Sequence, residues 1–164
     1  MRYKPDIYHR SYSGKITSAN VLGGTKVLGE KIRTPMDWHN LILKGIPAGV
    51  IDRLNEKWGL TDIFIARIVG ASARTISRKR QIAGERLSTV QSDRLYRIAR
   101  IIALAVDVFE DKETALEWLN KRQPGLGSRT PFDMLQTAPE TAEVESLLYR
   151  LRNPSKHFTE IVEP

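Results

Sequence analysis

Cysteine is absent from the 164-residue sequence, which excludes disulfides, thiolate metal sites and a cysteine nucleophile and suits a reducing compartment. Histidine is scarce, and His9, His39 and His157 stand too far apart in the chain to form a HExxH pair or a zinc-type cluster. No apolar run is long enough to cross a membrane, and the basic N-terminal stretch lacks the apolar centre of a secretory signal. We therefore expect a cytoplasmic protein that is not an enzyme and that needs no metal or other cofactor.

Charge is abundant but unevenly distributed. The formal net charge is +7, and residues 1–43 carry +4, residues 44–100 carry +7 and residues 101–164 carry −4. A basic segment raises the local concentration of polyanions such as DNA, whereas an acidic segment does not. The asymmetry is typical of a chain with two kinds of partner. The hydrophobic share of 41% indicates that such a chain folds.

Helix caps and helix stops punctuate most of the sequence, and the apolar spacing between them is helical. Residues 1–30 show no clear period, so we expect a flexible or loosely packed extension there. No convincing strand pattern occurs, and the sequence predicts an all-α fold. The predicted helices run from Pro35 to Gly45, Pro47 to Gly59, Thr61 to Gly70, Ser72 to about Arg80, Ser88 to about Phe109, Asp111 or Lys112 to Pro124, and Thr141 to Arg152.

Residues 59–80 have the layout of a helix-turn-helix, with two short helices joined at Gly70. We expect Ile63, Val69 and Ile76 to fill the space between the two helices. The second helix presents hydroxyl and cationic side chains, which suit base edges and phosphates. Predicted base or near-base contacts are Ser72, Arg74, Thr75 and Arg78; Ser77 lies on the same helix; and predicted phosphate contacts are Lys79, Arg80 and Arg86.

The long helix that begins at Ser88 carries two adjacent apolar stripes. One stripe contains Leu95, Ile98, Ile102, Ala105 and Phe109, and the other contains Ile101, Leu104 and Val108. A helix that is apolar on two sides has to be covered on both. This pattern predicts a homodimer, or a higher even oligomer, formed by the region from Ser88 to Phe132.

Several short motifs resemble the Xre/MbcA/ParS antitoxin family over about residues 34–153. They are Lys44-Gly45-Ile46-Pro47, Arg86-Leu87-Ser88, Ser92-Asp93-Arg94-Leu95, Ala115 to Leu119, and Leu126-Gly127-Ser128-Arg129-Thr130-Pro131. The resemblance implies an antitoxin whose partner is a RES-domain toxin that consumes NAD. It also implies dimerisation through the C-terminal domain, shielding of the toxin's active site and repression of the antitoxin's own operon.

The sequence departs from the family pattern at two places. Members commonly carry a glycine pair where this chain has Gly127-Ser128, and an acidic-Gly or His-Gly pair where it has Asn153-Pro154. The expected organisation is an extension (1–33), a helix-turn-helix DNA-binding domain (34–87), a helical toxin-binding and dimerisation domain (88–153) and a tail (154–164).

The tail carries apolar anchors although Asn153-Pro154 ends the helix before it. Apolar anchors on a flexible segment suit folding upon binding. The predicted toxin contacts are Lys156, His157, Phe158, Ile161 and Val162. The alternatives are a tail that packs on its own domain or stays disordered, with the inhibitory surface on the helices between Ser88 and Arg152.

Two other functions remain open at this stage. The chain can be a plain transcriptional regulator whose C-terminal domain only dimerises. A gene for a RES-like protein next to this one would favour the antitoxin instead. It can also be a helical scaffold without a DNA role. A salt-dependent shift of its own promoter fragment separates the scaffold from the other two functions.

Overall fold

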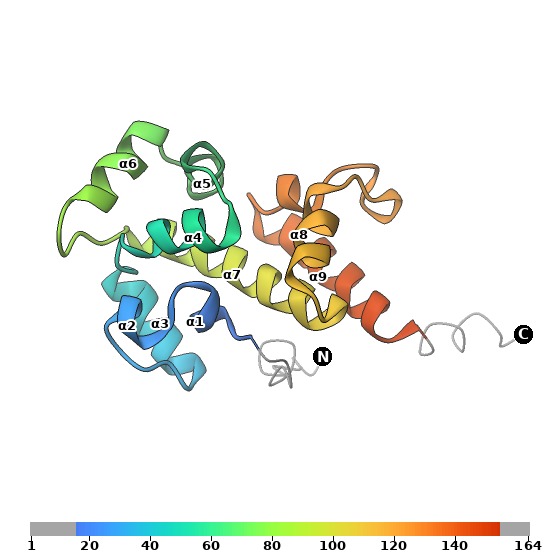
Figure 1. Ribbon diagram of the computed structural model, residues 1–164, viewed down its shortest axis with the longest axis horizontal. Coiled ribbons are helices and arrows are strands. Elements are labelled where there is room, and N and C mark those ends of the chain that lie inside the picture. Colours follow the sequence, from blue (N-terminus) through green and yellow to red (C-terminus); the bar gives the residue numbers. More distant parts are fainter. Residues whose placement is uncertain (1–15, 155–164) are drawn as a thin grey trace, which may run out of the picture.

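The computed structural model describes residues 16–154, and this part of the chain is helical without a strand (Figure 1). Only two isolated bridges occur within it, Pro47 with Arg86 and Gln123 with Arg129. The all-α prediction is therefore confirmed. The α-helices are α1 (Ser18–Val21), α2 (Gly24–Leu28), α3 (Pro35–Lys44), α4 (Val50–Trp58), α5 (Asp62–Val69), α6 (Ala73–Gln81), α7 (Thr89–Phe109), α8 (Lys112–Asn120) and α9 (Ala138–Arg152), with 3-10 turns η2 (Pro124–Leu126) and η3 (Pro131–Met134).

Side-chain caps fix where most of these helices begin. Thr61 and Ser72 each accept a hydrogen bond from the backbone N–H three residues on, as the sequence predicts. Thr34 and Ser88 form complete capping boxes, with Asp37 and Gln91 respectively. Because each cap satisfies backbone donors that have no partner inside the helix, short helices such as α5 and α6 gain defined starts.

Two predicted helix starts are wrong. The last helix begins at Ala138 rather than Thr141, because Thr137 caps it and accepts a hydrogen bond from the Glu140 backbone. The helix expected from Pro47 begins at Val50. Pro47 instead pairs with Arg86 in an isolated bridge, which holds the strand-like turn before α4 against the segment that leads into α7.

The expectation of a loosely packed N-terminal extension is wrong for residues 16–30. Helices α1 and α2 lie against the rest of the molecule, and Val21, Leu22 and Leu28 are completely or almost completely buried. The Trp58 indole donates a hydrogen bond to the Val21 carbonyl oxygen at 3.0 Å. The weak periodicity arises because both helices are only one turn long, too short for a repeating apolar pattern.

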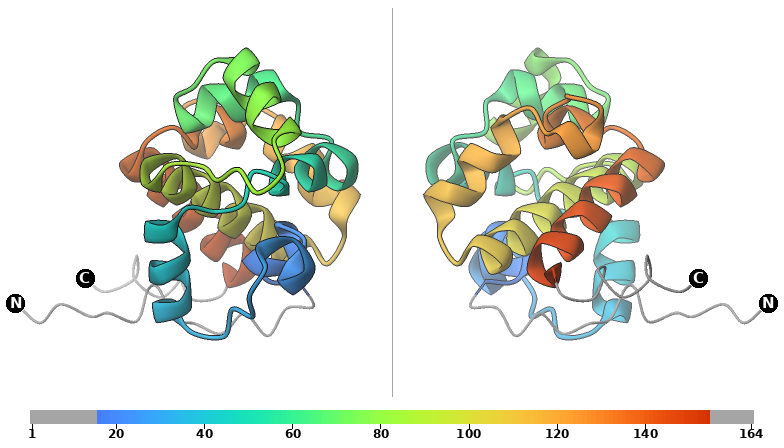
Figure 2. Two further views of the ribbon diagram at one scale, coloured as in Figure 1. Left: turned by 90° about the vertical axis from the view of Figure 1, so that its left-hand side faces the viewer. Right: turned by 90° about the vertical axis from the view of Figure 1, so that its right-hand side faces the viewer.

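Helix α7 forms the centre of the fold. It runs through the molecule with α5 and α6 above it and α1 and α3 below it in Figure 2, while α8 and α9 pack along its C-terminal half. Leu95, Ile98, Ile102 and Leu104 are fully buried within one chain. The protein's own helices thus cover the two apolar stripes except at Val108 and Phe109, which are partly buried, and the stripes no longer require a second chain to cover them.

Contacts besides α7 join the two halves of the protein. The rings of Phe64 on α5 and Phe132 on η3 meet edge to face, with centroids 5.0 Å apart. Next to them, Arg67 forms an ion pair with Asp133 at 3.0 Å. The buried Ser92 hydroxyl accepts a hydrogen bond from the Ile46 backbone at 2.8 Å, which ties α7 to the turn before α4. The predicted domain boundary at residue 87 therefore divides the sequence, but the segments on either side of it share one hydrophobic core.

Candidate DNA-binding and toxin-binding surfaces

Helices α5 and α6 form the predicted helix-turn-helix, with Gly70 in a left-handed conformation between them. Val69 and Ile76 are buried where the helices meet, as predicted. Ile63 is not between the helices, because 75% of its surface is exposed. Ile65 and Ile68 occupy the buried face of α5 instead, since the helix is apolar on more than one side and its orientation is set by packing on α7.

The outer face of α6 carries two of the predicted DNA contacts in the open. Arg74 and Arg78 are exposed and stand one helical turn apart, so their guanidinium groups lie on the same face. Ser77 and Thr75 are half-buried. The Ser72 hydroxyl accepts the Thr75 N–H at 3.0 Å, so its first role is that of the helix cap. Two exposed guanidinium groups on one face of a helix suit the edges of DNA bases and the adjoining phosphates.

The three predicted phosphate contacts all have partners within the protein. Lys79 donates from Nζ to Glu85 Oε1 at 2.9 Å and to the Arg86 carbonyl at 3.0 Å. Arg80 Nη1 donates to Asn55 Oδ1 at 2.6 Å. Arg86 Nη1 donates to the Gly45 carbonyl at 2.5 Å. Their contact with phosphate stays a prediction, but each side chain is engaged in holding loops and helices together.

The Lys79 ammonium also affects the group it binds. Its hydrogen bond and positive charge hold the pKa of the Glu85 carboxyl below its ordinary value, so Glu85 stays ionised. An ionised Glu85 offsets the charge of Lys79 at the C-terminal end of α6. The exposed positive charge of α6 therefore lies at Arg74, near its N-terminus, and at Arg78, in its last turn.

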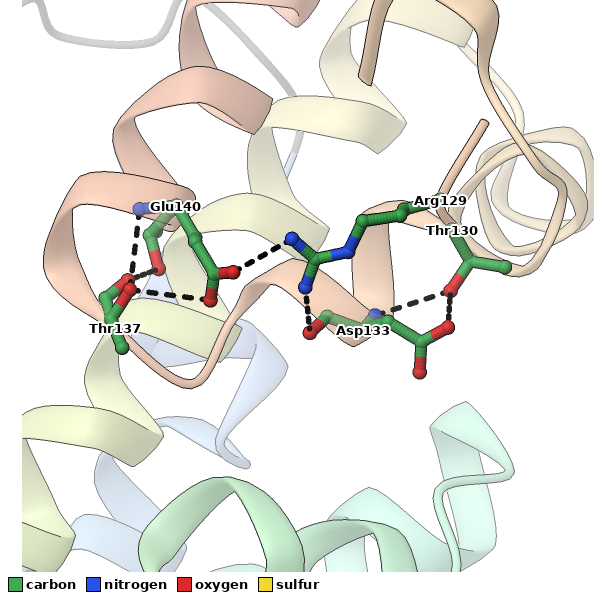
Figure 3. Close-up of polar contacts among 6 residues, drawn as sticks. Arg129, Thr130, Asp133, Thr137 and Glu140 are labelled. Atoms are coloured by element: carbon green, nitrogen blue, oxygen red, sulfur yellow. Dashed lines mark hydrogen bonds and ion pairs between the residues drawn. The ribbon is translucent and has the colours of Figure 1, made fainter. Parts of the chain in front are cut away.

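The segment between α8 and α9 is held by a chain of polar contacts (Figure 3). Arg129 forms an ion pair with Glu140 at 2.8 Å, and Thr130 donates to the Asp133 carboxylate at 2.6 Å. The Thr130 hydrogen bond, aided by the nearby Arg67 and Arg129 charges, holds the pKa of Asp133 below its ordinary value. Our sequence reasoning missed the Arg67–Asp133 and Arg129–Glu140 pairs, because the partners of each pair come from different elements.

The departure at Gly127-Ser128 has a structural reading. Both residues adopt positive φ, +62° for Gly127 and +58° for Ser128, which is the conformation that favours glycine. The turn is closed by the Ser128 N–H, which donates to the Gln123 carbonyl at 3.0 Å, and by Arg122, which donates to the Ser128 carbonyl at 3.0 Å. The glycine pair of the family fits this turn, and Ser128 holds the same geometry at some cost in strain.

The predicted toxin contacts Lys156, His157, Phe158, Ile161 and Val162 lie outside the described residues. In residues 16–154, no group of histidine and carboxylate side chains is arranged to hold a metal ion. No helix in this part of the chain is long and apolar enough to span a membrane.

Two family models match successive parts of the chain. Residues 37–100 match the antitoxin Xre-like helix-turn-helix domain, and residues 104–153 match the antitoxin Xre/MbcA/ParS C-terminal toxin-binding domain. The helix-turn-helix described above lies in the first match, and α8 to α9 lie in the second.

Relatives named Antitoxin Xre cover most of the chain. The one from Yersinia enterocolitica is 31% identical over 134 residues, which are 79% of this chain and 90% of that protein. The one from Photorhabdus laumondii is 34% identical over 119 residues, 70% of this chain and 78% of that protein. The one from Pseudomonas putida is 31% identical over 121 residues, 74% of each chain.

Proposed function

The chain belongs to the Xre antitoxin family, and on that premise we propose that it neutralises a RES-domain toxin that degrades NAD and represses its own operon. The observation that carries the proposal is the presence of a helix-turn-helix and a toxin-binding domain on one chain, built around the shared helix α7. The same α7 core and the Arg67–Asp133 pair join the half that matches the helix-turn-helix domain to the half that matches the toxin-binding domain.

The toxin half of the proposal is tested in cells. A RES-like open reading frame beside this gene, which the proposal requires, is expressed from an inducible promoter, with and without this chain, and growth and NAD content are measured. Expression of the toxin alone lowers NAD and stops growth, and co-expression of this chain restores both. Restored growth with NAD still depleted would contradict the proposed mode of action.

The inhibitory element is either the tail or the helical domain. We propose the tail, with Phe158 and Ile161 docking in the toxin and α9 as its base, because both apolar side chains follow the helix stop at Asn153-Pro154. A variant truncated after Arg152 should then lose neutralisation in cells. If it still binds and silences the toxin, the inhibitory surface lies on the helices between Ser88 and Arg152.

Operator binding rests on the exposed face of α6. In this proposal α6 enters the major groove, where Arg78 contacts a base edge. Replacing Arg78 by Ala should cost about 1–3 kcal/mol of binding free energy and relax preference at one position. The control is Arg150→Ala, another exposed arginine, on α9, which should leave operator affinity unchanged. Equal effects of the two substitutions would contradict the placement of α6 in the groove.

A homodimer remains part of the proposal, because a two-fold protein matches a palindromic operator. Within residues 16–154, large apolar side chains available for an interface are Met36, Leu43, Ile63, Ile82, Val90 and Leu151. Of these, Val90 lies in the region from Ser88 to Phe132. Light scattering of the full chain tests the dimer, and a monomer at micromolar concentration would count against it.

A further inference from the structure

Arg80 lies where three helices of the DNA-binding half meet. From α6, its Nη1 donates to Asn55 Oδ1 on α4 at 2.6 Å and to Asp62 Oδ1 at the start of α5 at 3.2 Å. Asp52 Oδ1, also on α4, is 3.7 Å from the same nitrogen. Asn55 completes the junction, because its Nδ2 donates to the Leu60 carbonyl at 2.5 Å and to Asp62 at 3.2 Å. One guanidinium thus connects α6 to both helices that precede it.

The charges around Arg80 differ from those around the outer arginines of α6. Two carboxylates, Asp52 and Asp62, lie within 4 Å of its guanidinium, and 30% of its side chain is exposed. A phosphate that approached Arg80 would therefore meet two negative charges beside one positive charge. Arg74 and Arg78, by contrast, are exposed on the outer face of α6. Arg80, which lies beside two carboxylates, and Arg74 and Arg78, which are exposed, belong to the same helix but have different surroundings. These surroundings suit different roles.

Position along the helix agrees with this division. Arg78 and Arg80 are two residues apart, and residues at that spacing point to different sides of a helix. Ile76 is buried between α6 and its neighbours, and Arg80 is four residues further on, on the same inner side as Ile76. Arg80 therefore lies on the side of α6 that packs against α4 and α5, and its contacts there are hydrogen bonds to Asn55 and Asp62.

We infer that Arg80 is a positioning residue: it fixes the orientation of α6 relative to α4 and α5 and contacts no phosphate. This inference rests on the proposed DNA binding and revises the role expected for Arg80 from the sequence. Sequence-specific recognition requires α6 to hold a fixed angle in the groove, whereas non-specific binding depends on charge. Loss of a positioning residue should lower specific binding and leave non-specific binding intact.

The test compares two DNA duplexes of equal length, one carrying the chain's own promoter sequence and one of random sequence. Binding of the full chain is measured by fluorescence anisotropy at several salt concentrations, for wild type, Arg80→Ala and Arg80→Lys. Arg80→Ala should bind the promoter at least about fivefold more weakly, which corresponds to about 1 kcal/mol, and bind random DNA as wild type does. The slope of affinity against salt on random DNA should not change.

Arg80→Lys distinguishes the roles with a milder change. Lysine keeps the charge, which suffices for a phosphate contact, but lacks the planar fork that reaches Asn55 and Asp62 together. The inference therefore expects weaker promoter binding by Arg80→Lys and unchanged random-DNA binding. Circular dichroism at the assay temperature checks that each variant is as folded as the wild type. If Arg80→Ala does not fold, Arg80→Lys alone tests the inference.

Two results would overturn the inference. One is an equal loss on both duplexes in Arg80→Ala, with the salt slope shallower by about 0.9, because that is the signature of one lost phosphate contact. The other is wild-type behaviour of Arg80→Lys on the promoter. A wild-type chain that binds promoter and random DNA alike would instead refute operator recognition itself, and the inference would fall with it.

Discussion

The ion pair between Arg100 on α7 and Glu145 on α9 gives the sharpest stability prediction. Only 11% and 12% of the two side chains are exposed, so both charges lie almost out of water. Arg100 also faces the ring of Tyr96, at 5.8 Å from its centroid. Replacing Glu145 by Ala removes the carboxylate that the Arg100 guanidinium binds, and loss of one member of a fully buried pair with no other partner costs about 3–5 kcal/mol.

Residual exposure and the other interactions of Arg100, among them its contact with the Tyr96 ring, reduce that figure to the lower end of the range, and we expect about 3 kcal/mol for Glu145→Ala. For a domain of this size, such a loss lowers the melting temperature by about 6–12 °C. Urea unfolding should show a midpoint lower by about 1–3 M with an unchanged slope. Circular dichroism of wild type and variant, followed through thermal and urea unfolding, measures both quantities.

Glu30→Ala is the matched control. Glu30 pairs with Lys44 at 3.7 Å, and 41% and 59% of the two side chains are exposed. An exposed pair of this kind contributes less than about 1 kcal/mol. The double variant Arg100→Met with Glu145→Leu should recover most of the loss, because it removes both charges and keeps apolar volume. Equal destabilisation by Glu145→Ala and Glu30→Ala, or a double variant as unstable as the single one, would refute the reasoning.

Three further predictions concern backbone strain and pH. Gly45→Ala should destabilise the fold by about 3 kcal/mol or more, because φ is +94° and a Cβ would strike a backbone carbonyl. Gly84→Ala, with positive φ but open space, should cost about 1 kcal/mol in the same urea assay. Ser128→Gly, at φ +58°, should stabilise by up to about 1 kcal/mol, whereas Ser146→Gly inside α9 should destabilise by about as much; the same sign for both would contradict this. The pKa of Asp133 is lowered in the fold, so the stability lost in Asp133→Asn should be full at pH 7. The loss should begin to shrink as the pH falls through about 4 and vanish below the lowered pKa of the folded state; a loss independent of pH would argue against this.

The sequence predicted the parts of the fold that local chemistry determines. The caps at Thr34, Thr61, Ser72 and Ser88 and the helix-turn-helix at Gly70 depend on residues close together in the chain, and each lies where expected. Burial was harder to predict. Ile63 is exposed although its spacing matches an apolar face, because packing on α7 chose a different face of α5.

The site shows the same limit. Arg80 reads as a cation on a recognition helix, and its role depends on Asn55 and Asp62, which lie 25 and 18 residues earlier in the sequence. Similarly, the two apolar stripes of α7 indicated that both sides of this helix pack against other helices. Whether those helices belong to the same chain or to a second one depends on the tertiary structure. Here they are α1, α3, α5, α8 and α9 of the same chain. Composition and periodicity carry no information about such long-range partners.

The central position of α7 constrains how proteins of this kind diversify. The two family matches divide between residues 100 and 104, in the middle of a helix that packs against both halves and on which Leu95, Ile98, Ile102 and Leu104 are fully buried. A chimera of two relatives joined at that point would pack the core residues of one protein's N-terminal half against α7 side chains that had evolved with a different N-terminal half. Exchange of whole modules is therefore a poor evolutionary route to a new pairing of operator and toxin. In the proposed mode of DNA binding, substitution at exposed positions such as Arg74 and Arg78 would change what the protein recognises without disturbing the core that the two halves share.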